Sequence, residues 1–322
     1  MSGAAFGSER GFGQLPFVAA PKLVPSLAPY SRPRPHAEPL LGPLLMPRAL
    51  ENPTILVFDS GLGGLTVYRE VARARPDARF VYAADDALFP YGALAEPVLI
   101  ARVVSLMERL TDAYAPDLVV IACNTASTIV LPSLRARLPL PFVGTVPAIK
   151  PACAASRSKR VSVLGTKATV EREYTRALIR EYAAGCAVTL VGSPRLAALA
   201  EAALAGEPVT DAAIAAEIAP CFVADGAART DTIVLACTHY PLLLDRLARL
   251  APWPVAFIDP APAIARRVVE LIGKPGRHDG ATARALFTSG RPPSAGLVAT
   301  LGRYGLSEIV APERFDSSEV SA

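Results

Sequence analysis

From Thr54 onward, short apolar runs alternate with longer amphipathic segments, and this alternation constrains the fold of the 322-residue chain more than any other feature. The runs have strand length and read TILVFDS, FVYAADD, DLVVIAC, PFVGTV, RVSVLGT, VTLVGS, DTIVLAC and VAFIDP. Segments between them, such as PVLIARVVSLMERLTDAY and TVEREYTRALIREYA, have helical periodicity. Strands that alternate with helices predict a doubly wound α/β fold with mainly parallel sheets, whose ligands bind at the carboxyl ends of the strands.

Two of the runs repeat one another. In DLVVIACNTAST and in DTIVLACTHYPLL, the apolar run ends in Ala-Cys and polar residues follow. Cys123 and Cys237 therefore lie at equivalent strand ends. Earlier in each half, a comparable strand ends in a residue with a hydroxyl group. In the first half this residue is Ser60, which follows Asp59, and in the second half it is Thr166. The repeat predicts two pseudo-symmetric domains that face a central cleft.

The organisation along the chain follows from these patterns. Residues 1–52 contain nine prolines before Pro53 and show no periodicity, which predicts a Pro-rich disordered arm. We expect a first domain over 53–147 plus 259–322 and a second over 148–258. A translation start at Met46 is an alternative that would remove most of the arm.

Composition excludes several classes of protein. Residues 1–50 carry five Lys or Arg and two Asp or Glu, which is +3 of the net charge of +4. The remainder is therefore nearly neutral and offers no basic surface for binding nucleic acid. No apolar run has the roughly 18 residues that a membrane span needs. The five cysteines contain no C-x-x-C pair and no metal-ligand spacing, which favours a reduced, cytoplasmic setting without a metal site.

The glycine-rich stretch VFDSGLGGLTVYREV invites a nucleotide-binding interpretation that its spacing does not support. It contains neither G-x-x-x-x-G-K-[ST] nor G-x-G-x-x-G. The glycines could instead let the backbone approach a small anion at a helix N-terminus, or Asp59 could simply cap that helix. The sequence leaves both interpretations open.

The matched cysteines favour chemistry over packing. A lone cysteine is most often a small buried hydrophobe, and we interpret Cys153, Cys186 and Cys221 in that way. Cys123 and Cys237 sit where a strand gives way to a helix, and the helix dipole there should lower a thiol pKa toward neutrality.

Polar residues accompany both cysteines. Asn124 and Thr125 follow the first, and Thr238 and His239 follow the second, where amide and hydroxyl groups can hold carboxylates and an ammonium. His239 could be a base for Cys237 or a satisfied core imidazole. Glu201 lies on a helical stretch, and by default we interpret it as a solvated charge.

Together these motifs resemble the glutamate racemases of the aspartate/glutamate racemase superfamily. The resemblance runs from about Thr54 to about Arg267 and rests on FDSGLGGLTV, FPYG, ACNTAST, GTVPAIKPA, GTKATV and CTHYPLL, in family order. Ser193-Pro194 stands where many members have Cys-Pro, and with VPAIKPA it resembles the enterobacterial-type subgroup.

The resemblance implies an isomerase without a cofactor that interconverts L- and D-glutamate for peptidoglycan biosynthesis. Cys123 and Cys237 would face opposite sides of the substrate Cα, each acting as base in one direction and acid in the other. Asp59, His239 and Glu201 would assist them. The matched substrate-binding residues are Asp59, Ser60, Tyr91, Gly92, Asn124, Thr125, Thr166, Thr238 and His239, with Thr169 as a further hydroxyl.

Partners and alternatives also follow from the resemblance. The subgroup implies UDP-N-acetylmuramoyl-L-alanine as an activator. The competing interpretations are an aspartate or hydantoin racemase, a non-catalytic small-molecule binder and a gyrase-binding protein. A pyridoxal-phosphate racemase would need a Schiff-base lysine, and no lysine has a supporting pattern. Monomer and homodimer both remain open.

Overall fold

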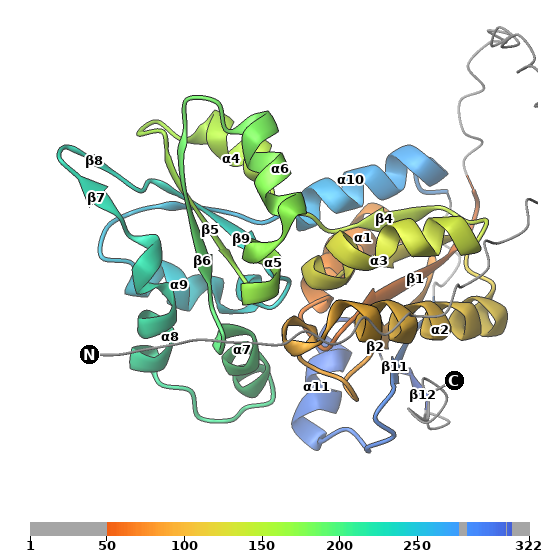
Figure 1. Ribbon diagram of the computed structural model, residues 1–322. Coiled ribbons are helices and arrows are strands. Elements are labelled where there is room, and N and C mark those ends of the chain that lie inside the picture. Colours follow the sequence, from red (N-terminus) through yellow and green to blue (C-terminus); the bar gives the residue numbers. More distant parts are fainter. Residues whose placement is uncertain (1–49, 277–281, 307, 311–322) are drawn as a thin grey trace, which may run out of the picture. The chain divides into compact units, whose positions relative to one another are not determined.

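The computed structural model describes residues 50–276, 282–306 and 308–310. The first 49 residues, and with them most of the predicted arm, lie outside the described residues. The described chain forms two larger sheets and one small hairpin. All pairings within the two larger sheets are parallel, which confirms the predicted α/β class with mainly parallel sheets (Figure 1).

The first sheet has the strand order β12-β11-β2-β1-β3-β4. Its strands are β1 (Thr54–Asp59), β2 (Arg79–Ala84), β3 (Leu118–Ile121), β4 (Phe142–Gly144), β11 (Ala283–Phe287) and β12 (Glu308–Val310). Residues of β1 and β3 are almost wholly buried, as expected of parallel strands covered on both faces.

The second sheet repeats the middle of the first. Its order is β10-β9-β5-β6, from β5 (Arg160–Gly165), β6 (Ala187–Gly192), β9 (Thr232–Ala236) and β10 (Ala256–Ile258). The order β6-β5-β9-β10 therefore matches β2-β1-β3-β4 of the first sheet. The strands that precede Cys123 and Cys237 thus each lie beside the first strand of their own half.

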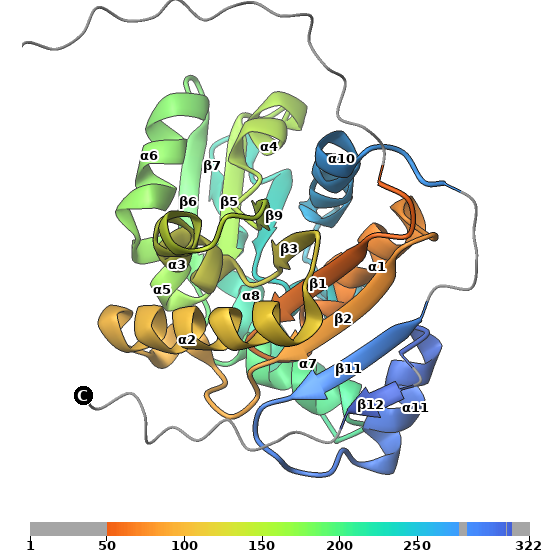
Figure 2. The same cartoon turned by 90° about the vertical axis from the view of Figure 1, so that its right-hand side faces the viewer.

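Helices cover both faces of the first sheet. On one face lie α1 (Leu65–Ala74), α10 (Ala261–Ile272) and α11 (Ala295–Arg303), and on the other α2 (Glu96–Tyr114) and α3 (Asn124–Arg137). Alternate residues of β1 explain the division, because Ile55 and Val57 pack with the first group and Leu56 and Phe58 with the second. Figure 2 shows α1 and α10 on one side of β1 and β2 and α2 on the other.

The second sheet is covered in the same manner. One face packs against α4 (Ile149–Ala155) and α6 (Glu173–Tyr182), and the other against α7 (Leu196–Leu204), α8 (Asp211–Ile218) and α9 (Leu244–Leu250). Short elements complete the chain: α5 (Lys167–Glu171), the 3-10 helices η1 (Tyr91–Ala93), η2 (Ala219–Cys221) and η3 (Tyr240–Leu243), and the antiparallel hairpin of β7 (Ala224–Asp225) and β8 (Ala228–Arg229).

Several elements differ from the sequence interpretation. The segment TVEREYTRALIREYA is not one helix, because Arg172 adopts an extended backbone (φ −68°, ψ 140°) between α5 and α6. β11 and β12 extend the first sheet although their sequences, ARALF and EIV, are too short to show a period. The division into 53–147 plus 259–322 and 148–258 stays a proposal.

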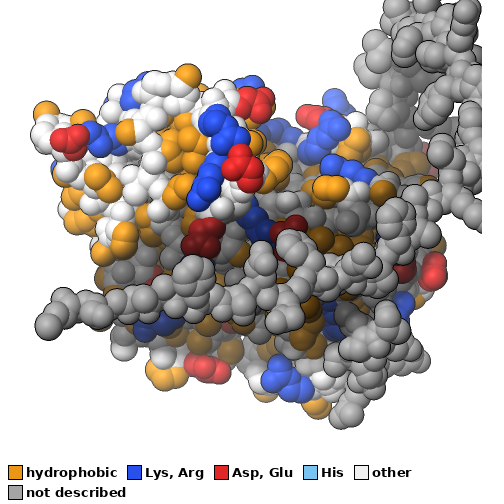
Figure 3. All heavy atoms as spheres, in the orientation of Figure 1, with side chains coloured by type: hydrophobic (Ala, Val, Ile, Leu, Met, Phe, Trp, Pro, Cys, Tyr) orange, Lys and Arg blue, Asp and Glu red, His pale blue; other side chains and the backbone are white. Residues whose placement is uncertain are grey.

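In the described part of the chain, no helix is both long and apolar enough to cross a bilayer. Charged side chains of both signs occur on the face shown in Figure 3, with basic groups next to acidic ones. Fifteen of the ion pairs seen among the described residues join Arg or Lys to a carboxylate, and most of these are at least partly exposed. Such pairs add little to stability.

Candidate active site

The strand ends of the two sheets meet around one small cavity. Its lining consists of Ser60, Phe89, Pro90, Tyr91, Gly92, Cys123, Asn124, Thr125, Thr166, Ala197, Cys237, Thr238 and His239. The void measures about 20 Å³, which is room for about one water molecule. Both cysteines of the repeat therefore line the same enclosed space, one from each sheet.

Cys123 lies at the N-cap of α3, directly after β3. The backbone N–H of Ala126 points at its sulfur over 3.5 Å, and its thiol donates to Ser60 Oγ at 3.7 Å. Burial nevertheless raises the pKa of Cys123 strongly, and the nearby Asp59 carboxylate raises it further. The prediction of a thiol lowered toward neutrality is wrong for Cys123, because one weak N–H contact does not offset the loss of water.

Cys237 has a different setting. It follows β9 but leads through a turn into η3, a four-residue 3-10 helix, rather than into an α-helix. Its polar neighbour is the imidazole of His239, whose Nδ1 lies 3.8 Å from the sulfur. The two thiols are therefore placed alike but surrounded differently.

His239 connects Cys237 to Glu201 on α7. Its Nε2 lies 2.8 Å from Oε1 of Glu201 and 3.2 Å from the backbone nitrogen of Gly63, and Oε1 also accepts the backbone N–H of Leu62 at 2.7 Å. Burial by itself lowers the pKa of His239, but the hydrogen bonds to Cys237 and Glu201 outweigh it and hold that pKa well above its ordinary value. These contacts favour the protonated ring, and Glu201 pairs with His239 instead of being a solvated charge.

The glycine-rich turn after β1 makes room for these groups. A Cβ on Gly61 would lie 2.1 Å from Glu201 Oε1, and one on Gly63 would lie 2.4 Å from His239 Nδ1. The glycines therefore serve close approach of the second half of the chain. Asp59 stabilises this turn, because its Oδ2 accepts hydrogen bonds from the backbone N–H groups of Gly61 and Gly64. Burial raises the pKa of Asp59.

Hydroxyls and an amide complete the lining. Thr125 Oγ1 lies 3.2 Å from Thr166 Oγ1 and 3.4 Å from Thr169 Oγ1, so these hydroxyls join the two halves. The side chain of Asn124 is buried, and neither its amide nitrogen nor its oxygen has a partner among the described residues. A buried amide costs free energy unless it is hydrogen-bonded, so Asn124 points to a polar ligand in the cavity.

The structure brings most of the predicted residues together. Asp59, Glu201 and Thr169 differ from the rest, because they contact cavity residues without lining the cavity themselves. Sequence reasoning missed Phe89, whose ring centroid lies 5.2 Å from that of His239, and Ala197 on α7. Phe89 directly precedes the FPYG proline and could have been found there. No group of three or more potential ligands among the described residues could hold a metal ion.

Comparisons with known proteins identify the family. A family described as Asp/Glu/Hydantoin racemase matches residues 64–268. A glutamate racemase of Agrobacterium fabrum is 53% identical over 244 residues, which cover 75% of this chain and 89% of that protein. One of Brucella anthropi is 56% identical over 235 residues, covering 73% and 84%.

A solved structure agrees with these relatives. The crystal structure of Escherichia coli glutamate racemase, in complex with L-glutamate and the activator UDP-MurNAc-Ala, is 39% identical in sequence to this chain. The TM-score is 0.74, and the match covers 80% of this chain and 97% of that one. The chain belongs to the Asp/Glu/Hydantoin racemase family and, within it, to the glutamate racemases.

Proposed function

We propose that the protein interconverts L- and D-glutamate by direct proton transfer at Cα, with Cys123 and Cys237 as the two acid–base groups. The product D-glutamate would serve peptidoglycan biosynthesis. The observation that carries this proposal is the placement of two free, buried thiols from two matching strand ends on one cavity. The two enantiomers carry the α-hydrogen on opposite sides of Cα, so a racemase needs one proton carrier on each side.

Each turnover moves one proton off the substrate and another onto it. A thiolate on one side takes the α-proton and becomes a thiol, which leaves the electron pair on Cα. The thiol on the other side then gives its proton to Cα and becomes the thiolate. The reaction in the opposite direction begins from that exchanged state, so no net proton is consumed.

The charges in the resting site favour one starting state. Burial and Asp59 keep Cys123 in its thiol form. The His239 imidazolium lies 3.8 Å from the sulfur of Cys237 and stabilises negative charge there. Cys237 is thus poised as the base and Cys123 as the acid, with Glu201 balancing the imidazolium on its far side.

Substrate would be held by the remaining polar lining. Asn124 offers an unpaired amide, and Ser60, Thr125 and Thr238 offer hydroxyls to the carboxylates and the ammonium. The void of about 20 Å³ is too small for glutamate, so substrate entry requires the two halves to separate. The contacts that would break include the Arg172–Glu96 ion pair and the Thr125–Thr166 contact, both of which join the halves.

Circular dichroism tests this function. The wild-type protein should remove the optical activity of L-glutamate and of D-glutamate alike, and Cys123→Ser and Cys237→Ser should each abolish the change. Cys186→Ser is the matched control, because that half-buried cysteine lies outside the cavity and its loss should leave racemisation intact. A wild-type protein that leaves both signals unchanged, or a Cys123→Ser or Cys237→Ser variant that retains activity, contradicts the proposal. The same assay with L-aspartate tests whether the protein acts on aspartate instead of glutamate.

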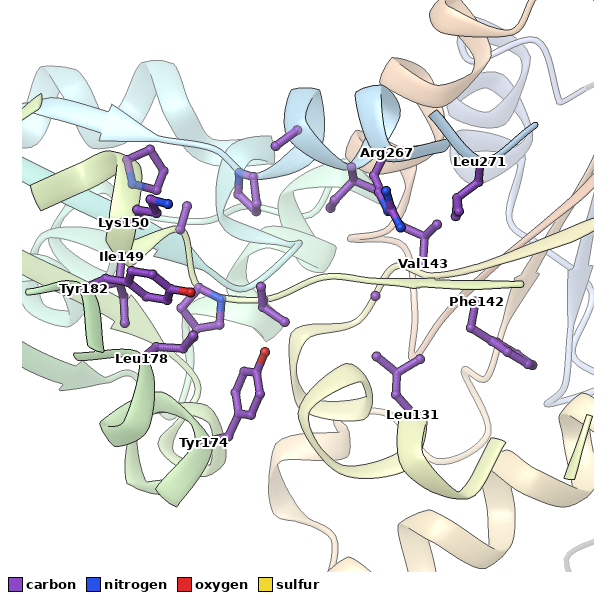
Figure 4. Close-up of a pocket in the computed structure, with 18 of the residues that line it drawn as sticks. Leu131, Phe142, Val143, Ile149, Lys150, Tyr174, Leu178, Tyr182, Arg267 and Leu271 are labelled. Atoms are coloured by element: carbon purple, nitrogen blue, oxygen red, sulfur yellow. The ribbon is translucent and has the colours of Figure 1, made fainter. Parts of the chain in front are cut away.

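A second pocket supports activation by UDP-N-acetylmuramoyl-L-alanine. It has a volume of about 850 Å³ and is lined by residues of β4, α4, α6 and α10. Figure 4 shows Tyr174, Tyr182 and Lys150 on one side of it and Arg267 on the other. Lysine and arginine suit a diphosphate, and tyrosine rings suit stacking with a nucleobase. The E. coli relative was solved with this type of activator.

Racemisation with and without the precursor tests the activation. The precursor should raise kcat/KM of the wild type and have a weaker effect in Arg267→Ala. Arg266→Ala is the control, because its neighbouring side chain on α10 lines a different groove. Equal rates with and without the precursor rule activation out. A reducing compartment, such as the cytoplasm, would preserve the two thiols that the reaction needs.

A further inference from the structure

A buried polar network lies directly behind the substrate-binding turn of Tyr91 and Gly92. At its centre is Asp85, which follows β2 and is fully buried. Tyr91 donates its hydroxyl to Asp85 Oδ2 at 2.6 Å. Tyr91 itself is 1% exposed and lines the cavity, while its hydroxyl is bound to Asp85, which does not line it.

Two further groups hold Asp85. Arg102 on α2 donates Nε to Oδ2 at 3.0 Å and Nη2 to Oδ1 at 2.7 Å, which is a two-pronged ion pair. Thr288, at the end of β11, donates its hydroxyl to Oδ1 at 2.5 Å. Asp85 thus accepts from three separate segments of the chain, all of them buried at this point.

The C-terminal segment adds a second tie to the same loop. Thr288 Oγ1 also accepts the backbone N–H of Ala87, and Ser289 donates both its N–H and its hydroxyl to Asp86. Thr288 and Ser289 lie beyond residue 268, where the family match ends. The loop that carries Tyr91 is therefore fixed partly by a segment outside the residues that the family model matches.

We propose that Asp85 is a positioning residue for racemisation, which through the Tyr91 hydroxyl holds the Tyr91–Gly92 turn in its substrate-binding geometry, with Arg102 and Thr288 orienting Asp85. The inference rests on the proposed function. Asp85 touches neither the cavity nor the thiols, so it acts on binding instead of on proton transfer. A displacement of about 1 Å in such a turn is enough to weaken catalysis by up to about 100-fold.

An ion pair that only stabilises the fold should affect Tm and not KM. The chain contains such a pair for comparison. Arg75 and Asp77 form another buried pair, with both side chains 0% exposed, but Arg75 also donates to the carbonyls of Ile272 and Gly273 at the end of α10. It has the same chemistry and burial as Arg102–Asp85 without contact to a cavity residue. Asp77→Asn is therefore the matched control for Asp85→Asn.

The test combines kinetics, glutamate binding and thermal unfolding on the full chain. Asp85→Asn should raise KM for both enantiomers about tenfold or more and change kcat by less than about threefold, since the loss of a hydrogen bond to a charged group is worth about that much. The acid limb of its pH profile should not move. Tyr91→Phe and Thr288→Val should raise KM in the same direction, and Asp77→Asn should lower Tm without changing KM.

The outcomes separate the two proposals. If wild-type protein racemises glutamate but Tyr91→Phe and Thr288→Val keep the wild-type KM and calorimetric affinity, the positioning role is overturned. If Asp85→Asn does not fold, these milder variants still test the positioning role. A shift in KM for Asp77→Asn as large as for Asp85→Asn also overturns it. A folded wild type that neither binds nor racemises glutamate overturns the proposed function, and this inference with it.

Discussion

His239 and Glu201 form an ion pair with 2.8 Å between Nε2 and Oε1, although 38 residues separate them in the chain. The pair raises the pKa of His239 against the effect of burial. Because the folded-state pKa is raised, the stabilisation it gives is fully present below the unfolded pKa near 6.5 and is lost as pH rises through the folded pKa.

Glu201→Gln should therefore lower the pKa of His239. Each unit of that decrease removes about 1.4 kcal/mol from the free energy of unfolding at acidic pH, and the difference from wild type should vanish above the wild-type His239 pKa. An NMR titration of the histidine rings, assigned with His239→Gln, measures the pKa, and urea unfolding at several pH values measures the stability. An unchanged His239 pKa would show that Glu201 is not its counter-ion.

Replacing the imidazolium should affect catalysis in a defined way. In His239→Gln the sulfur of Cys237 loses the imidazole that lies 3.8 Å away, so kcat/KM should fall about 100-fold near neutrality. The enantiomers have equal free energy, so kcat/KM must fall equally in both directions. A variant that keeps the wild-type kcat/KM would rule out this role for His239.

Asn124 should show a trade between stability and binding. Its amide is buried without a partner among the described residues, which costs about 1–3 kcal/mol. Asn124→Leu keeps the approximate shape, so it should raise Tm while raising KM about tenfold or more through lost hydrogen bonds to the substrate. Thermal unfolding and initial-rate kinetics measure the two effects. A drop in both Tm and KM would contradict the assignment.

The sequence could predict the parts of the fold and site that are local. The eight apolar runs became strands, and the Ala-Cys repeat correctly placed Cys123 and Cys237 around one cavity. The charge of His239 could not be predicted, because Glu201 reaches it only through tertiary packing. The environment of Cys123 was also misjudged, since burial depends on what the rest of the chain places over the thiol.

The glycines illustrate the same limit. The sequence suggests that GLGG lets the backbone approach something, but only the structure shows that Glu201 and His239 are the neighbours. The network of Asp85 has no sequence signal for a related reason: Thr288 directly follows β11, whose sequence is too short to show a strand period. Contacts between distant segments leave no local pattern to read.

Two glycine substitutions test the close approach. In Gly63→Ala the new Cβ would lie 2.4 Å from Nδ1 of His239 and 2.7 Å from its backbone nitrogen, so the variant should lose stability and most activity. Gly302→Ala on α11 meets nothing within 4 Å and should instead stabilise the protein by up to about 1 kcal/mol. Tm and racemisation rates measure both, and a harmless Gly63→Ala would mean that His239 can move aside.

The central claim is that two different residues carry the proton on the two sides of Cα. The most direct test follows deuterium at Cα by NMR during the initial phase of racemisation of L-glutamate in D₂O. The D-glutamate formed should carry deuterium while the remaining L-glutamate keeps its hydrogen, because the thiol that removes a proton is not the one that delivers it. Deuterium appearing equally fast in the unconverted L-glutamate would mean that a single base serves both faces, and would contradict the account.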